Sequence, residues 1–158
     1  MYKRVLIPVD GSEVAEAVIP FIQDIAGPLD LEVVLLYVTQ PIPPVDMVGS
    51  PYMVVDDLET RRDAARAYLA GLAAEMKGRG IRVTTVDRCG DAVDEILATS
   101  RESGADLIAM TTHGRTGPAR LLFGSVAEGV LRHSDMPVFL MRQTEREIAR
   151  RRRQEVAR

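Results

Sequence analysis

The sequence predicts an α/β protein: a single doubly wound, Rossmann-like domain with a five-stranded parallel sheet and helices on both faces. Short apolar runs alternate along the chain with segments whose apolar residues recur every three or four positions, which is typical of successive βα units. The apolar runs lack regular polar alternation, as expected for strands that are buried on both faces. A hydrophobic content of 46% in 158 residues is sufficient for one core.

The first strand and the first helix are expected at residues 5–9 and 13–25. The strand is a short apolar run, and the helix shows apolar residues on one face. Between them lies a short polar turn that ends in Ser12, the expected N-cap of the helix. Pro20 falls inside the helical pattern, so we expect a kink there.

The second strand is expected at residues 31–38, and a proline-rich loop insertion follows at residues 39–55. Loops of this length are often lids or binding loops. The next helix is expected at residues 56–77, where Gly78 helps to end it. The remaining elements, in chain order, are a strand at 81–86, a helix at 91–103, a strand at 106–111, a helix at 125–134 and a strand at 136–141.

Charge divides the chain into an acidic body and a basic end. Residues 143–158 contain six Arg and three Glu and carry +3, so with a net charge of −3 residues 1–142 carry −6. We assign residues 1–142 to the α/β domain and residues 143–158 to an Arg-rich C-terminal tail. An acidic body with few aromatic residues lacks the basic surface and stacking platforms of nucleic-acid binders, so no nucleic-acid partner is expected. The arginine run at 150–153 is interpreted as a solvated extension, with contact to phosphates or anionic lipid as the alternative.

The sequence also predicts the compartment. The longest strictly apolar run, residues 33–38, is far shorter than the roughly 20 residues of a transmembrane helix, so no membrane span is expected. The amino-terminal segment does not read as a secretory signal. The single cysteine, Cys89, cannot form an internal disulfide. We therefore expect a cytoplasmic protein in which Cys89 is inert.

The most informative motif joins the fourth strand to the fourth helix, over residues 110–126. Gly114 allows the backbone to turn tightly and to approach a ligand closely. Gly124 and Ser125 open a helix whose free N–H groups and positive dipole end suit an anion. Ser125 and Glu128 also have the spacing of a capping box. From the residues alone, phosphate binding and simple helix capping therefore both remain open.

Other nucleotide motifs and reactive groups are missing from the sequence. No lysine precedes Ser125, as a Walker A loop requires, and no Gly-x-Gly-x-x-Gly turn follows the first strand, as an NAD site requires. Asp10, after the first strand, either caps its own turn or faces a ligand. His113 has no second histidine or cysteine motif near it, so neither a zinc site nor a catalytic triad is assigned.

These motifs resemble those of the universal stress protein (UspA-like) family, and the resemblance covers residues 4–142. The stretch Val5-Leu-Ile-Pro-Val-Asp-Gly-Ser12 is similar to the family's first strand and turn, and the strongest match is Thr112-His-Gly-Arg-Thr-Gly117 with Gly124-Ser-Val-Ala-Glu128. In the ATP-binding branch of the family, the signature is a glycine, two residues, a second glycine, nine residues, and Gly-Ser or Gly-Thr. This sequence has the second glycine and the closing pair, whereas Thr111 stands at the first glycine and adds a β-branched side chain there.

The resemblance implies that the chain binds ATP, with Mg²⁺ as a possible companion, at the carboxyl ends of the strands. It places adenine and ribose against the residues after the first strand, adenine against the end of the second strand, and the phosphates along the motif of the fourth strand and helix. The residues expected to bind the nucleotide are Pro8, Val9, Asp10, Val38, Thr111, Gly114, Arg115, Gly124, Ser125 and Val126. No catalytic residue and no metal ligand is assigned.

Three functions are consistent with this sequence. The first is a regulatory stress-response protein that binds ATP or another adenine nucleotide. The second is a slow Mg²⁺-dependent ATP hydrolase at the same site, although the sequence shows no general base aimed at the phosphates and no lysine in the loop. The third is an interaction module that no longer binds nucleotide, for which Thr111 is the argument.

A homodimer through the strand at 136–142 is the expected assembly. This last strand is almost wholly apolar, and the family's topology places it at a sheet edge, where open apolar strands invite pairing. A two-fold axis covers such an edge with its own copy. Pro137 lacks an N–H, so pairing is expected nearer Phe139 and Leu140. The alternative is that the tail folds back over the edge.

Overall fold

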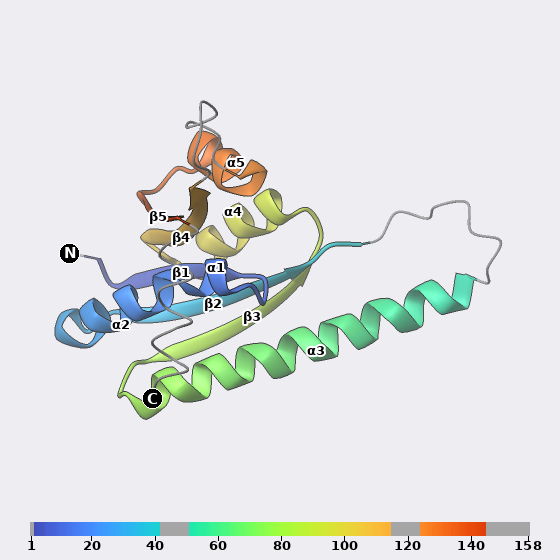
Figure 1. The fold of residues 1–158 in the computed structure, drawn as a ribbon, viewed down its shortest axis with the longest axis horizontal. Coiled ribbons are helices and arrows are strands. Elements are labelled where there is room, and N and C mark those ends of the chain that lie inside the picture. Colours follow the sequence, from blue (N-terminus) through green and yellow to red (C-terminus); the bar gives the residue numbers. More distant parts are fainter. Residues whose placement is uncertain (1, 42–50, 115–123, 145–158) are drawn as a thin grey trace.

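Five parallel strands form the central sheet, in the order β3-β2-β1-β4-β5 (Figure 1). The computed structural model describes residues 2–41, 51–114 and 124–144, and at residues 51–56, 113, 114 and 144 it describes the backbone alone. The strands are β1 (Arg4–Val9), β2 (Glu32–Thr39), β3 (Val83–Cys89), β4 (Leu107–Gly114) and β5 (Val138–Thr144). The strand order reverses between β1 and β4, which confirms the predicted doubly wound sheet.

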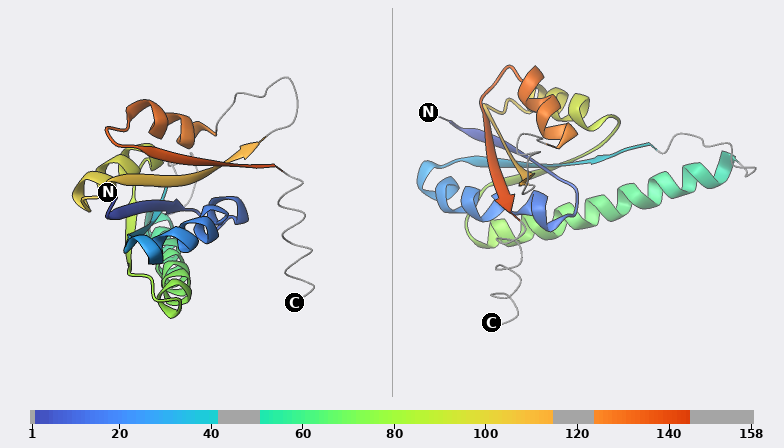
Figure 2. Two further views of the ribbon diagram at one scale, coloured as in Figure 1. Left: turned by 90° about the vertical axis from the view of Figure 1, so that its left-hand side faces the viewer. Right: turned by 45° about the horizontal axis from the view of Figure 1, so that its top comes forward.

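Helices cover both faces of this sheet (Figures 1 and 2). On one face lie α4 (Ala92–Glu102) and α5 (Ser125–His133), and on the other lie α1 (Glu13–Glu16), α2 (Val18–Leu29) and α3 (Pro51–Gly78). Each face has its own apolar cluster. In β2, Val33 and Leu35 belong to the cluster beside α2 and α3, whereas Val34 and Leu36 belong to the cluster beside α4 and α5. A strand that serves two cores must be apolar throughout, which explains the unbroken apolar run.

The first predicted helix is divided in two at Ala17. The short helix α1 is capped by Ser12, whose Oγ accepts the N–H of Ala15 at 3.1 Å, as predicted. Helix α2 begins directly after Ala17, so Pro20 lies in its first turn. The missing N–H of Pro20 has no intrahelical partner at that position, so the proline fits without a break. The break at Ala17 therefore replaces the kink expected at Pro20.

The predicted loop at residues 39–55 is shorter than expected, because α3 begins at Pro51 and runs for 28 residues. Pro51 was interpreted as a loop residue, but proline also suits the first position of a helix. Three strands end three residues later than expected: β3 continues to Cys89, β4 to Gly114, and β5 to Thr144, which lies two residues past the predicted domain boundary. Within the described segments of the chain, helices are too short or too polar to cross a bilayer.

An ion-pair network attaches α3 to the edge strand β3. The carboxylate of Asp87, on β3, accepts from the guanidinium of Arg62 at 2.8 Å and from that of Arg66 at 3.0 Å. The side chain of Asp87 is only 9% exposed. This hydrogen bond with Asp87 is the main reason that the pKa of Arg62 is raised. The network holds two of α3's arginines in fixed positions.

A second contact ties α3 to α1. The hydroxyl of Tyr68, on α3, donates to the carboxylate of Glu16 at 2.6 Å. Burial raises the pKa of Tyr68, and the hydrogen bond to Glu16 raises it further. The folded protein therefore holds the phenol proton more tightly than the unfolded chain does.

Replacing this phenol, with Tyr68→Phe, should lower the free energy of unfolding by about 1–2 kcal/mol at pH 7, because the hydrogen bond to a carboxylate is lost. The contribution is present below the unfolded tyrosine pKa of about 10 and is lost as the pH rises above it, because the folded pKa is the higher of the two. Urea unfolding at neutral pH and at a pH above 10 checks both points. The gap between parent and variant should narrow at the higher pH, and an equal gap at both would contradict the assignment.

Candidate functional site

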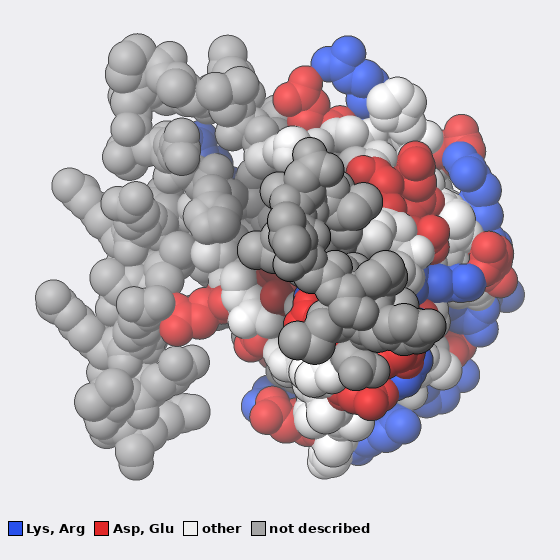
Figure 3. Space-filling view, turned by 90° about the vertical axis from the view of Figure 1, so that its right-hand side faces the viewer, with Lys and Arg blue, Asp and Glu red and all other residues white. Residues whose placement is uncertain are grey.

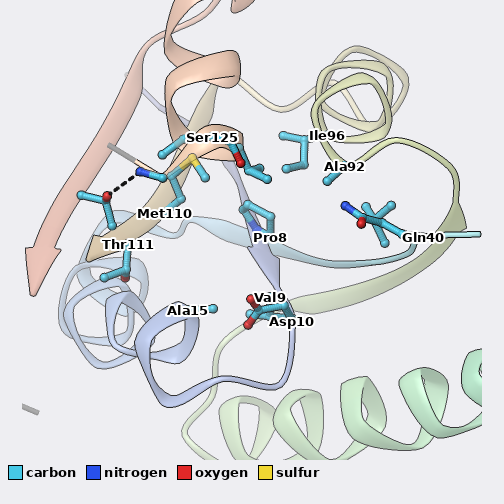
Figure 4. Close-up of a pocket in the computed structure, with 15 residues that line it drawn as sticks. Pro8, Val9, Asp10, Ala15, Gln40, Ala92, Ile96, Met110, Thr111 and Ser125 are labelled. Carbon is cyan, nitrogen blue, oxygen red and sulfur yellow. Dashed lines mark hydrogen bonds between the residues drawn. The ribbon is translucent and has the colours of Figure 1, made fainter. Parts of the chain in front are cut away.

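A cavity of about 440 Å³ opens at the carboxyl end of the sheet, where β1 and β4 lie side by side (Figure 4). Parallel doubly wound sheets bind their ligands at this reversal point, and the volume is in the range of small-molecule sites. Figure 4 shows Ser125 and Asp10 on opposite sides of the cavity, with Pro8 between them. The cavity thus has the α5 terminus on one side and the turn after β1 on the other.

Eight of the ten predicted residues line this cavity, and they come from four separate segments of the chain. They are Pro8, Val9, Asp10, Val38, Thr111, Gly124, Ser125 and Val126. The ninth, Gly114, is the last residue of β4 and is not among the lining residues, and the tenth, Arg115, lies outside the described residues. Because β1, β2 and β4 run parallel, these segments meet at the carboxyl end of the sheet.

Seven further residues line the cavity that the sequence analysis did not single out. They are Ala15, Gln40, Ala92, Ile96, Met110, Thr112 and Ala127. Some of them had a signal in the sequence. Met110 and Thr112 flank Thr111 at the expected end of the fourth strand, and Ala92 and Ile96 lie one turn apart on a predicted helix. The position of Gln40 depends on where β2 ends, which the sequence does not define to the residue.

The amino terminus of α5 borders the cavity without a side-chain cap. Gly124 is the N-cap and Ser125 the first helical residue, so the predicted capping box from Ser125 to Glu128 is wrong. The carboxylate of Glu128 instead pairs with Arg132 at 2.9 Å. Glu128 N–H donates to Gly124 C=O at 2.9 Å, so the N–H groups of the three residues between them have no intrahelical partner. Within the described residues, no hydrogen bond engages these N–H groups or the Ser125 hydroxyl, which leaves them for a ligand.

A hydrogen bond ties this helix terminus to β4. The N–H of Gly124 donates to Oγ1 of Thr112 at 3.4 Å, drawn as the dashed line in Figure 4. Thr112 is 5% exposed, and its side chain faces the cluster beside α4 and α5. The contact positions the N-cap glycine above the carboxyl end of the sheet.

Asp10 caps its own turn and also lines the cavity. Its Oδ1 accepts the N–H of Ser12 at 2.9 Å, which fixes the turn between β1 and α1. The same residue lines the cavity, and its Oδ2 has no hydrogen-bond partner in the described part of the chain. Asp10 is the acidic side chain of the cavity lining.

Thr111 lies on the opposite side of β4 from Thr112. Figure 4 shows its side chain on the α1 side of the cavity, toward Ala15 and away from Ser125. Its Oγ1 is buried and has no hydrogen-bond partner among the described residues. The added bulk of this residue therefore narrows the cavity on the α1 side.

Groups that support metal or thiol chemistry are sparse around the sheet. In residues 2–41, 51–114 and 124–144, three or more His, Cys, Asp or Glu side chains nowhere gather into a cluster that could hold a metal ion. Cys89 is a free, exposed cysteine at the end of β3. The main features of the first cavity are its apolar walls, the carboxylate of Asp10 and the amino terminus of α5.

Comparison with known proteins identifies relatives of the whole chain. The universal stress protein MJ0531 of Methanocaldococcus jannaschii is 32% identical over 149 residues, covering 93% of this chain and 86% of that protein. The solved structure of MJ0577 from the same organism has a TM-score of 0.76 at 26% identity, covering 90% of this chain and 97% of that one.

Two solved structures of universal stress proteins contain a nucleotide. One is a complex with cAMP, with a TM-score of 0.66 at 20% identity over 89% of this chain and 97% of that one. The other, from Archaeoglobus fulgidus, is a complex with dAMP, with a TM-score of 0.59 at 18% identity over 88% and 97%. The model of the universal stress protein family matches residues 1–142. By its fold, its sequence and the match to the family model, the chain belongs to the universal stress protein family.

Proposed function

We propose that this chain binds ATP in the cavity between β1 and β4 and acts as a regulatory, stress-response homodimer. One observation carries the proposal: eight residues expected to bind nucleotide surround a single cavity, beside a helix amino terminus that no described side chain caps. Backbone N–H groups at such a terminus bind phosphate oxygens, and the helix dipole favours their negative charge.

The chemistry of the lining supports a place for each part of the nucleotide. Val38 and Pro8 offer apolar surface for the adenine, and the carboxylate of Asp10 accepts from ribose hydroxyls. Gly124, with no side chain, lets phosphates approach the helix terminus, where the Ser125 hydroxyl adds a donor. Gly114, Arg115 and Val126 complete the expected phosphate contacts. A Mg²⁺ ion that accompanies ATP would be held by phosphate oxygens and by Asp10.

The choice of adenine is supported by two relatives. The universal stress proteins solved with cAMP and with dAMP hold adenine nucleotides, and both share the fold of this chain. Other properties are in agreement with an intracellular nucleotide binder. Figure 3 shows acidic and basic side chains interspersed over the described surface that it displays, a distribution unlike a basic nucleic-acid footprint. A single free cysteine fits a reducing compartment, and we propose the cytoplasm.

Titration calorimetry with ATP and with GTP, each with Mg²⁺, tests the proposal. ATP should bind and GTP should bind more weakly, because adenine fits the apolar slot at Val38 without the polar substituents of guanine. Mass analysis of nucleotide released from freshly purified protein gives an independent readout. The absence of both heat and thermal stabilisation with millimolar ATP would leave the interaction-module alternative. Turnover of ATP with Mg²⁺ would favour the hydrolase alternative.

Thr111→Gly should strengthen ATP binding several-fold, since it removes a branched side chain from the α1 side of the cavity. Thr111→Val is the matched control, because it keeps the bulk and removes only a hydroxyl that has no hydrogen-bond partner among the described residues. Calorimetry on the three proteins should therefore give Thr111→Val the same affinity for ATP as the parent. If Thr111→Val binds ATP as tightly as Thr111→Gly, the hydroxyl of Thr111 rather than its bulk weakens ATP binding in the parent.

A further inference from the structure

A second cavity, of about 470 Å³, lies beside the first at the carboxyl end of β2. Val38 and Gln40 line both cavities and separate them. Tyr37 and Tyr68 of the second cavity pack against the cluster beside α3, whereas Met110 and Ile96 of the first cavity belong to the cluster beside α4 and α5. The second cavity is therefore a separate space between β2, the turn after β1, and α3.

Arg61, on α3, supplies the charge of this cavity. It is the one charged side chain among the lining residues that the structure describes. The neighbouring arginines Arg62 and Arg66 are held by Asp87, but Arg61 has no hydrogen bond or ion pair with the described residues. A guanidinium offers a planar fork of donors that matches a carboxylate. Arg61 is thus a cationic group whose hydrogen-bonding capacity the described residues leave unused.

Thr39 supplies an unused hydroxyl deep in the same cavity. It is the last residue of β2 and is 3% exposed. Its Oγ1 is buried and has no hydrogen-bond partner among the described residues. A buried hydroxyl without a partner is unfavourable, because it has given up its hydrogen bonds to water. A ligand that bonds to Thr39 would recover part of this cost.

The remaining wall is aromatic and small. The rings of Tyr37 and Tyr68 meet edge to face, with centroids 5.9 Å apart and planes at 74°. Ala64 and Ala65 leave room beside them. The hydroxyl of Tyr68 is occupied by Glu16, so its ring rather than its hydroxyl is offered to the cavity. This wall suits a flat apolar group.

We propose that this second cavity binds a small organic acid whose carboxylate meets Arg61 and whose apolar or aromatic body packs against Tyr37 and Tyr68. The hydroxyl of Thr39 supplies a further hydrogen bond. The negative charges of Asp10 and Glu16 both raise the pKa of Tyr68, so both carboxylates lie near this wall. Repulsion from these like charges directs the ligand's carboxylate away from them and toward Arg61. The ligand class differs from the nucleotide of the first cavity, and the proposal does not rest on ATP binding.

Nuclear magnetic resonance titration of the full-length ¹⁵N-labelled protein tests this site, with benzoate and acetate as probes. Benzoate should shift the amide signals of Thr39, Ala64 and Ala65 in a saturable way, and acetate should do so more weakly because it lacks a ring. Arg61→Gln should weaken benzoate binding about tenfold or more, the loss of one charge-assisted interaction. Thr39→Val should weaken it by a smaller factor. Arg82→Gln removes an equal charge at an exposed arginine outside this cavity and should leave benzoate binding unchanged.

The outcomes separate this site from the first cavity. Retained ATP binding by Arg61→Gln, together with lost benzoate binding, is the expected result. Benzoate shifts that fail to saturate, or that survive Arg61→Gln unchanged, would overturn the proposal and leave a cavity filled by solvent. Benzoate shifts confined to Ser125 and Val126 would also overturn it, because the probe would then occupy the first cavity. The benzoate results can be interpreted whether or not the parent protein binds ATP.

Discussion

Gly124→Val should abolish ATP binding and leave the fold intact. Gly124 lines the first cavity and is the N-cap of α5, where phosphates must approach the free N–H groups. A Cβ at this position would meet no atom within 4 Å, so it enters open space. The backbone there has φ −56° and ψ 151°, which valine adopts readily. The variant therefore changes access to the helix terminus without straining the chain.

The expected loss in ATP affinity is about 100-fold or more, equivalent to about 2.7 kcal/mol, because displaced phosphates lose several hydrogen bonds at once. Calorimetry measures the affinity, and thermal unfolding checks the fold. Gly71→Val is the matched control: a Cβ there also meets no atom within 4 Å, but Gly71 lies on α3, away from the first cavity. If Gly124→Val binds ATP as tightly as Gly71→Val, the phosphates lie elsewhere.

The sheet was predictable because its signals are local and strong. The central strands β1 and β2 are apolar runs, and helical periods separate the strands, so element order and fold class follow from the sequence alone. The reversal of strand order between β1 and β4 was expected because the nucleotide motif resembles that of the universal stress protein family. Eight of ten expected residues consequently lie around one cavity.

Element ends were less predictable, because local chemistry is ambiguous there. Pro51 was assigned to a loop although proline also begins helices. Ser125 was weighed as a helix cap, but the cap is the residue before it. Gly114 was expected to turn the chain, yet β4 continues to it and pairs with β5. In each case one sequence signal is compatible with two local structures, and tertiary packing decides which of them forms.

The second cavity could not be predicted, since it depends on how α3 lies across β2. Arg61 and Thr39 are far apart in sequence, and neither belongs to a motif. Asp87 pairs with Arg62 and Arg66, and Arg61 is left without a partner among the described residues. The sequence places Arg61, Arg62 and Arg66 near one another on one helix. It does not show which of them will pair with a buried carboxylate.

The parent protein should be a homodimer, with twice the chain mass of 17.4 kDa by light scattering at micromolar concentration. β5 pairs with β4 on one side only, so within the described part of the chain its other edge is open. Apolar surface continues beside this edge: Phe139, on β5, stacks on Phe21 at 4.8 Å, and Phe21 is 42% exposed. Pairing of the edge with its own copy about a two-fold axis would cover both.

The register of the sheet shows which backbone groups face this open edge. Ile108 N–H donates to Pro137 C=O at 3.0 Å, and Ile108 is the register partner of Val138. In a parallel pair, alternate residues direct both their N–H and C=O groups to the same neighbour. The backbone groups of Val138, Leu140 and Arg142 therefore point away from β4, toward the open edge.

Leu140→Pro should convert the dimer to a monomer, because proline removes one outward N–H while every bond to β4 is kept. Leu140 is only partly buried, so the core loses little apolar contact. Thr85→Pro is the control at the opposite edge of the sheet. Val33 N–H donates to Arg82 C=O at 2.9 Å and Val33 pairs with Val83, so the exposed Thr85 directs its N–H away from β2. Thr85→Pro should remain dimeric. A monomeric parent would instead favour an edge covered within one chain, and dissociation by both variants would show that proline acts through lost stability rather than through the edge of β5.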